Sequence, residues 1–323
     1  MKCISKLRAL TVWCLLVSML TGCQSSYEDP YDFNTTIAAF SLDSQISTDC
    51  ADPFASELCV AGEDILPASV DLSLAQAEGL FSLSDHQTLV AENIHERMNP
   101  ASITKVMTAL LAIKYGRLDD TMIASKNVLI TESGAQVLPL AEGDRMTLDA
   151  ALHALMMYSA NDVAVMIAEY IAGSVEAFAE LMNSEAKELG ATNTHFVNPN
   201  GLTDEEHFTT AYDLYLIFNE AIRSEKFLEL INVMEYNGTY SDRDGNVKEL
   251  NLTNANSYLR GDVETPPGIT VIGGKTGTTK AAGSCLILLT ANSAGNKYIS
   301  VVLNAEDRAN LYAEMSELLK YIT

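Results

Sequence analysis

Three short motifs of serine, lysine and asparagine occur in a fixed order along this chain. Ser102-Ile103-Thr104-Lys105 comes first, Ser159-Ala160-Asn161 second and Lys275-Thr276-Gly277 third. A serine hydroxyl becomes a nucleophile when a nearby base takes its proton, and a lysine with a lowered pKa can be that base. Together the three motifs predict an enzyme that transfers acyl groups through an active-site serine.

The residues before Ser102 are typical of a helix start. Asn99 can accept hydrogen bonds from free backbone N–H groups, and Pro100 suits the first helical position because it has no N–H. We therefore expect Ser102 in the first turn, where its backbone N–H is free to bind a substrate oxyanion. Lys105 follows on the same helix face. The mostly apolar run over 103–113 predicts a buried helix, which lowers the pKa of Lys105 and favours its neutral amine.

The other two motifs have suitable surroundings for substrate binding. Thr147 is the expected cap of a helix over 148–157, and the second motif forms the loop that follows it, where a hydroxyl can relay a proton and an amide can bind a peptide group. The third motif belongs to a strand expected over 271–278, whose glycines allow a ligand to approach closely. Lys275 offers a positive charge for a carboxylate.

Each motif also has a purely structural interpretation. Lys105 could lie along the core with its ammonium group in water. Ser159 or Asn161 could cap the helix expected over 162–171, and the third motif could belong to an ordinary exposed edge strand.

Two other segments repeat these patterns in a different context. Ser184 and Lys187 have the spacing of the first motif, but they lie deep in the charged helix expected over 175–189 rather than at a helix start. Ser125 and Asn127 have the spacing of the second motif. The surroundings of Ser102 therefore favour it as the nucleophile.

Longer segments around these motifs resemble the serine D-alanyl-D-alanine carboxypeptidases, the low-molecular-weight penicillin-binding proteins, whose superfamily includes the β-lactamases. The resemblance extends from Ala68 to the C-terminus. It is carried by residues 99–109, by residues 196–214, which include His207, and by residues 274–285. We expect a structural role for His207.

The resemblance implies a role for individual residues. The catalytic residues would be Ser102 as nucleophile, Lys105 as base and Ser159 as proton relay. The substrate-binding residues would be Asn161, Lys275, Thr276, Gly277 and Thr278, of which Lys275 and the two threonines would hold a terminal carboxylate. The backbone N–H groups of Ser102 and Thr278 would form the oxyanion hole.

The implied reaction removes the terminal D-alanine from peptidoglycan stem pentapeptides through a Ser102 acyl-enzyme, with no cofactor and no metal ion. β-Lactam antibiotics would be covalent inhibitors. A β-lactamase is one alternative, although no Glu-x-x-Leu-Asn-like stretch between Ser159 and Lys275 offers a deacylating carboxylate. A noncatalytic lipoprotein that binds peptidoglycan is another alternative, and the complete set of motifs counts against it.

The N-terminus is typical of an exported lipoprotein. Three basic residues precede an apolar run over 9–20, which is short for a membrane span and typical of a cleaved signal peptide over 1–22. Leu20-Thr21-Gly22-Cys23 resembles the bacterial lipoprotein processing box, in which Cys23 is lipidated. Because the sequence ends after a helix expected over 308–321, whereas many family members continue into a β-rich domain and a membrane helix, we expect attachment at the N-terminus. An ordinary exported protein remains the alternative.

The charge balance limits the choice of partners. Three of the 20 basic residues and none of the 43 acidic ones lie in residues 1–22, so the remaining chain has a net charge of −26. Such a chain is a poor partner for nucleic acid, and an anionic membrane surface repels it, which leaves the lipid as the attachment. Residues 23–66 contain nine acids and no lysine or arginine, and we interpret them as an acidic tether.

The remaining chain, residues 67–323, has the size of one large domain. Short strands near 79–83 and 88–91 precede a long helical middle, and strands over 271–278, 284–291 and 298–304 follow it, with a hairpin at 244–245 in between. Strands from both ends of the domain predict an antiparallel sheet flanked by helices, an α+β fold. The five histidines are scattered without metal-ligand spacing, and an oxidising exterior would permit a Cys50–Cys59 disulfide.

Overall fold

The computed structural model describes residues 55–68 and 72–322. The predicted signal peptide, Cys23 and Cys50 therefore lie outside the described residues, as does most of the predicted tether. Within the described ranges, no helix is long and apolar enough to cross a membrane.

Residues 55–66, which we assigned to the tether from their acidic composition, pack on the domain. The Cys59 side chain is a buried free thiol that donates to the Ser82 carbonyl, and Ile65 forms a β-bridge with Ala91. The domain thus extends N-terminally of residue 67. The few apolar residues in this segment are spaced too irregularly to signal a packed strand.

The centre of the domain is a five-stranded antiparallel sheet with strand order β2-β1-β9-β8-β7. Its strands are β1 (Ala77–Ser82), β2 (Gln87–Glu92), β7 (Ile269–Thr279), β8 (Gly283–Asn292) and β9 (Lys297–Ala305). The two N-terminal strands thus join the three C-terminal ones in one sheet through the pairing of β1 with β9, as the sequence predicted. Side chains of β8 alternate between the two faces: Ile287 and Leu289 belong to one hydrophobic cluster, and Leu286 and Leu288 to the other.

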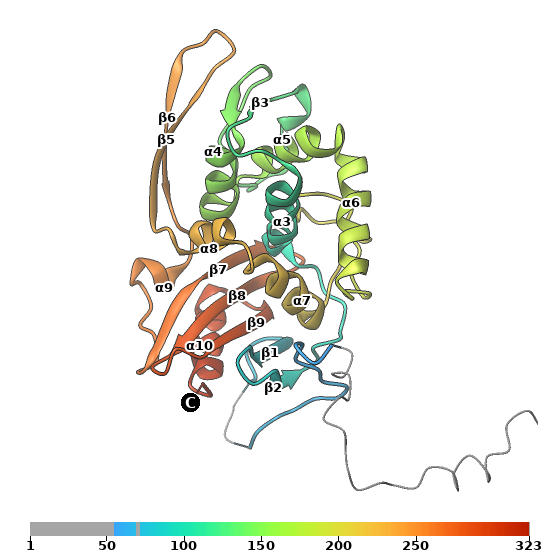
Figure 1. Ribbon diagram of the computed structural model, residues 1–323, viewed down its shortest axis with the longest axis vertical. Coiled ribbons are helices and arrows are strands. Elements are labelled where there is room, and N and C mark those ends of the chain that lie inside the picture. Colours follow the sequence, from blue (N-terminus) through green and yellow to red (C-terminus); the bar gives the residue numbers. More distant parts are fainter. Residues whose placement is uncertain (1–54, 69–71, 323) are drawn as a thin grey trace, which may run out of the picture. The chain divides into compact units, whose positions relative to one another are not determined.

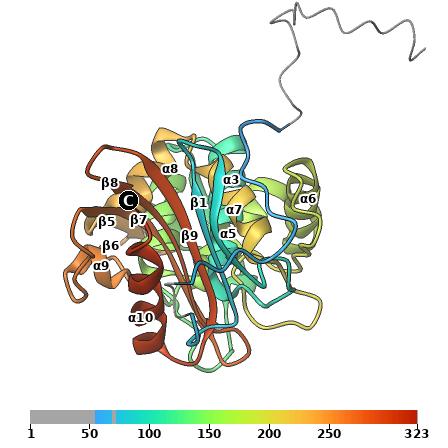
Figure 2. The ribbon, with the colours of Figure 1, turned by 90° about the horizontal axis from the view of Figure 1, so that it is seen from below.

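Helices cover both faces of this sheet, which confirms the α+β class (Figures 1 and 2). Helix α10 (Arg308–Leu319) packs on one face, and α3 (Lys105–Tyr115) and α7 (Ala211–Ala221) lie on the other. The other α-helices of the described residues are α4 (Leu148–His153), α5 (Asn161–Ala172), α6 (Val175–Glu188), α8 (Glu225–Asn232) and the short α9 (Ser257–Arg260). A second sheet has the order β3-β4-β5-β6 and consists of Thr121–Ile123, Arg145–Thr147, Glu235–Ser241 and Val247–Thr253. The turn between β5 and β6 contains residues 244–245, where the sequence predicted a hairpin.

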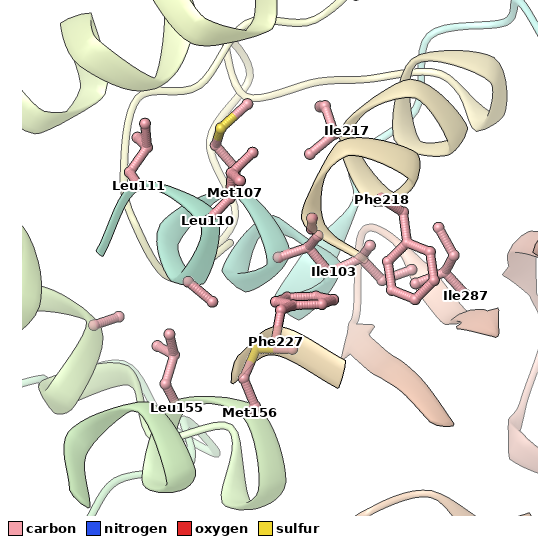
Figure 3. Packing of buried hydrophobic residues seen from close by; sticks show 14 of the residues in the cluster. Ile103, Met107, Leu110, Leu111, Leu155, Met156, Ile217, Phe218, Phe227 and Ile287 are labelled. Carbon is pink, nitrogen blue, oxygen red and sulfur yellow. The ribbon is translucent and has the colours of Figure 1, made fainter. Parts of the chain in front are cut away.

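Helix α3 lies at the centre of the helical layer (Figure 3). Met107 and Leu111 on α3 belong to the same buried cluster as Phe218 on α7 and Phe227 on α8. Residues 105–112 are all buried. The prediction of a buried central helix is therefore confirmed, and the lysine that opens this helix lies in the core.

The start of this helix differs from the prediction. Ala101 has a left-handed φ of +47°, so the α-helix cannot begin at Pro100. A 3-10 turn over Ala101–Thr104 (η1) comes first, and α3 begins at Lys105. Asn99 does bind a free backbone N–H, because its Oδ1 accepts from Ala101 at 3.0 Å. Ser102 thus lies in a tight turn in front of the helix.

Two buried carboxyl groups lie between the sheet and α10. Glu78 on β1 and Glu314 on α10 are 1 % and 0 % exposed. Burial, with the Glu314 carboxyl beside it, raises the pKa of Glu78 to about 10. Glu78 is therefore protonated at neutral pH in the folded protein, whereas an unfolded glutamate would be ionised.

We expect Glu78→Gln to stabilise the protein above neutral pH. A raised folded-state pKa contributes stability below about pH 4.5, and this contribution is lost as the pH rises toward about 10. Glutamine keeps the neutral shape without the ionisation cost. The unfolding midpoint at pH 8 should rise by about 2–4 °C, and by less at pH 5. Exposed Glu306→Gln serves as the control, and an equal effect of Glu78→Gln at both pH values would contradict the assignment.

Candidate active site

Ser102 is held in a backbone turn that the neighbouring segments enclose. Two glycines lie close against the turn. A Cβ atom on Gly277 of β7 would lie 3.0 Å from the Ser102 nitrogen, and one on Gly201 in the loop before α7 would lie 1.8 Å from the Ala101 carbonyl oxygen. Gly201 also has a φ of +82°. Gly201 therefore has no room for a side chain, a Cβ atom at Gly277 would be tight, and the turn with the left-handed Ala101 has little freedom to relax.

Lys105 reaches back from the first residue of α3 to the serine. Its Nζ lies 2.9 Å from Ser102 Oγ, 2.8 Å from Asn161 Oδ1 and 2.6 Å from the Asn200 carbonyl oxygen. The side chain is fully buried, and this burial, with Lys275 nearby, lowers the pKa of Lys105 well below its usual value. In its neutral form the amine can donate its two N–H groups to the Asn161 and Asn200 oxygens and keep a lone pair that can take the serine proton.

The second motif delivers two side chains to the same place. A π-helical turn over Ala154–Tyr158 ends at Ser159, which has a left-handed φ of +65°. Ala160 is the N-cap residue of α5 without a side-chain cap bond, so neither Ser159 nor Asn161 caps that helix. The Asn161 side chain instead accepts from Lys105 and donates to the Gln136 carbonyl at 3.0 Å.

Lys275 contacts Ser159 from a buried position on β7. Its Nζ donates to Ser159 Oγ at 3.1 Å and to the Thr276 carbonyl at 2.8 Å, and the side chain is 1 % exposed. Burial lowers the pKa of Lys275 to about 7. The ammonium group therefore does not line the open cleft, contrary to what a direct carboxylate ligand requires.

A cleft of about 630 Å³ opens in front of Ser102. Ser159, Asn161, Thr276, Gly277 and Thr278 line it, so the structure brings together the predicted residues of all three motifs. The sequence motifs did not identify Arg308, which lines the cleft from the start of α10, or the loop 132–136, which forms part of its wall. Arg308 donates to the Ala255 carbonyl at 2.6 Å. Nothing in the local sequence distinguishes it from a surface arginine.

Two further residues support the site without having a motif of their own. Asn200 contributes its backbone carbonyl to Lys105, a role that its side-chain type cannot reveal. Asp162 is buried and accepts from the backbone N–H groups of Leu138 and Leu140, which fixes the loop that carries Gln136. Burial raises the pKa of Asp162.

The repeated patterns elsewhere have no such surroundings. Ser184 and Lys187 are both exposed on α6. Ser125 accepts from the Asn127 backbone N–H and caps a short 3-10 turn. In residues 55–68 and 72–322, no group of three or more histidine, cysteine or acidic residues could hold a metal ion.

A strained serine turn, a buried lysine amine and an adjoining serine and asparagine define a serine acyl-transfer site on an α+β scaffold. The chain belongs to the Peptidase S11 family of D-alanyl-D-alanine carboxypeptidases, whose family model matches residues 75–307. It is 34% identical over 254 residues to the D-alanyl-D-alanine carboxypeptidase DacF of Bacillus subtilis, covering 76% of this chain and 61% of that protein.

A second relative and a solved structure are similar to the chain as well. The D-alanyl-D-alanine carboxypeptidase DacC of Escherichia coli is 30% identical over 277 residues, 83% of this chain and 65% of that protein. The chain thus matches less than two thirds of the length of these two relatives. The crystal structure of a Streptomyces DD-transpeptidase has the same fold, with a TM-score of 0.70 at 24% identity, covering 77% of this chain and 96% of that one.

Gly201→Ala should displace the serine turn. The added Cβ would lie 1.8 Å from the Ala101 carbonyl oxygen, so the turn must move, and a shift of ~1 Å at a reacting group costs about 100-fold in rate. We expect a loss of that order in the rate at which penicillin labels Ser102. Gly190→Ala is a matched control, because Gly190 has a φ of +83° but its Cβ would meet its nearest neighbour at an ordinary 3.8 Å. Similar labelling rates for both variants would contradict this account.

Proposed function

We propose that this protein is a serine D-alanyl-D-alanine carboxypeptidase that removes the terminal D-alanine from peptidoglycan stem pentapeptides. The observation that carries the proposal is the contact of 2.9 Å between Lys105 Nζ and Ser102 Oγ at the floor of the cleft. The family membership supports the choice of substrate. Its test is the release of D-alanine from a pentapeptide that ends in D-alanyl-D-alanine.

Acylation follows from the geometry of the two residues. Ser102 Oγ attacks the carbonyl carbon of the last peptide bond, and its proton passes to the lone pair of Lys105 Nζ. The backbone N–H groups of Ser102 and Thr278 receive the developing oxyanion. When the peptide bond breaks, the proton that Lys105 took from Ser102 passes through the Ser159 hydroxyl to the departing D-alanine amine. Water then hydrolyses the ester and restores the serine.

The substrate carboxylate needs donors that face the cleft. Thr276 and Thr278 line it, and so does Arg308, whose guanidinium is suited to a carboxylate. Lys275 is buried behind Ser159. We therefore assign the direct carboxylate contact to Arg308 and the two threonines, and give Lys275 a role in holding Ser159 and in the local positive potential.

The Ser102→Ala variant should release no D-alanine, because methyl cannot form the ester. Ser184→Ala is the matched control, since Ser184 has the same spacing to a lysine but is exposed on α6. We expect the control to retain wild-type activity, measured as D-alanine released per unit time. Equal losses in the two variants would exclude Ser102 as the nucleophile.

β-Lactams should leave a long-lived ester on Ser102. The opened ring stays tethered and obstructs water. Glu132 is the acidic residue lining the cleft in the described part of the chain, and it is exposed rather than held against Ser102. General-base help is typically worth ~10²–10⁴-fold, so its lack makes hydrolysis slow. Intact-protein mass spectrometry should show one penicilloyl group that persists for minutes, whereas rapid drug turnover without an adduct would indicate a β-lactamase.

The substrate implies an extracytoplasmic location, and we propose that Cys23 carries the lipid that attaches the protein to the membrane. The residues before Cys23 support this, because they resemble a lipoprotein processing box after an apolar run. Two acyl chains are enough for stable anchoring. Cys23→Ser should move the protein from the membrane fraction to the soluble fraction, with Cys59→Ser as the control. Unmodified wild-type protein found wholly in the soluble fraction would contradict lipidation.

A further inference from the structure

His207 contacts the serine turn although it does not line the cleft. Its imidazole is 1 % exposed, and Nδ1 accepts from the Val197 backbone N–H at 3.2 Å. The ring proton is therefore on Nε2, which lies 2.8 Å from Thr104 Oγ1 and donates to it. Thr104 Oγ1 in turn donates to the Ala101 carbonyl at 2.8 Å. The imidazole is thus linked by two hydrogen bonds to the residue with the left-handed backbone.

The backbone of His207 supports the other end of the same turn. Its carbonyl oxygen accepts from Asn99 Nδ2 at 3.3 Å, while Asn99 Oδ1 accepts from the Ala101 N–H at 3.0 Å. Ala101 is therefore held at its N–H through Asn99 and at its carbonyl through Thr104, and both connections end at His207. A left-handed alanine is costly unless its surroundings fix it.

We propose that His207 is a positioning residue for acylation, which holds Ser102 in its reactive turn through Thr104 and Asn99. It touches neither Ser102 nor the cleft, so it acts on the nucleophile only through these two residues. The donor on Nε2 is essential to this role. Burial lowers the pKa of His207 to about 4, so the imidazole stays neutral at physiological pH, although Asp204 opposes this shift and His195 and Lys105 support it.

This inference rests on the proposed function and adds a residue to it. The direct test is the rate of Ser102 acylation by penicillin, measured by mass spectrometry, in His207→Phe, His207→Gln and Thr104→Val. Phenylalanine keeps the packing but loses the donor, and we expect acylation to slow about 10- to 100-fold. Glutamine can donate to Thr104 from its amide nitrogen and should restore most of the rate. Apparent penicillin affinity should change less than acylation rate.

A double-mutant cycle shows whether the histidine acts through the threonine. If it does, the His207→Phe/Thr104→Val variant loses no more acylation rate than the worse single variant, because one hydrogen-bond chain can be broken only once. His195→Gln is the control, since His195 lies in the same segment and donates to the Glu206 carbonyl without reaching the turn. It should acylate at the wild-type rate.

Failure of the proposed function and failure of the positioning role of His207 give different results. A wild-type protein that is never acylated overturns the proposed function itself. If the wild type is acylated, then a normal rate in His207→Phe, a glutamine variant no faster than the phenylalanine variant, or additive losses in the double variant each overturn the positioning role. Should His207→Phe not fold, the glutamine variant and Thr104→Val still decide, since Thr104→Val must slow acylation.

Discussion

The burial of one lysine amine constrains the rest of this site. An ammonium group removed from water costs several kcal/mol unless it is paired with an opposite charge, and the atoms within hydrogen-bonding distance of Lys105 are neutral oxygens. The folded protein therefore favours the uncharged amine, which is the form that can accept the serine proton. Exposing this amine to water would return the lysine toward its ordinary pKa and remove the uncharged form that the proposed reaction needs. The apolar packing around α3 in Figure 3 thus has a catalytic consequence.

Three distant parts of the chain meet at this amine, and a fourth holds the neighbouring Ser159. The serine turn and α3 bring the proposed nucleophile and base, the segment after α4 brings Asn161, the segment before α7 brings the Asn200 carbonyl, and β7 brings Lys275. β7 is the edge strand of the main sheet, and Thr276, Gly277 and Thr278 near its end line the cleft. The rigid sheet sets one wall of the cleft, and the helical layer sets the other. Neither the sheet nor the helical layer alone carries all the groups that the proposed reaction needs.

Sequence patterns predicted the elements with regular periodicity and the side chains with distinctive chemistry. The strands of the main sheet and helices α3, α5, α6 and α10 lie close to their expected bounds, because alternation and amphipathic spacing report burial directly. The patterns failed where backbone geometry decides. Tertiary contacts decide the left-handed backbone of Ala101, which delays the start of α3. They also decide the position of the Asn200 carbonyl beside Lys105. Arg308 and the packed segment 55–66 likewise become recognisable only once the fold places them beside their partners.

We propose Lys105 as a general base whose pKa is lowered by burial, and the pH dependence of Ser102 acylation by penicillin tests this role most directly. An ordinary lysine, with a pKa near 10.5, would give a rate that rises about tenfold per pH unit from pH 7 to 10. The structure predicts instead that the rate already levels off well below pH 10, because burial lowers the pKa of Lys105. A rate that climbs without a plateau up to pH 10 in the folded protein would contradict the account.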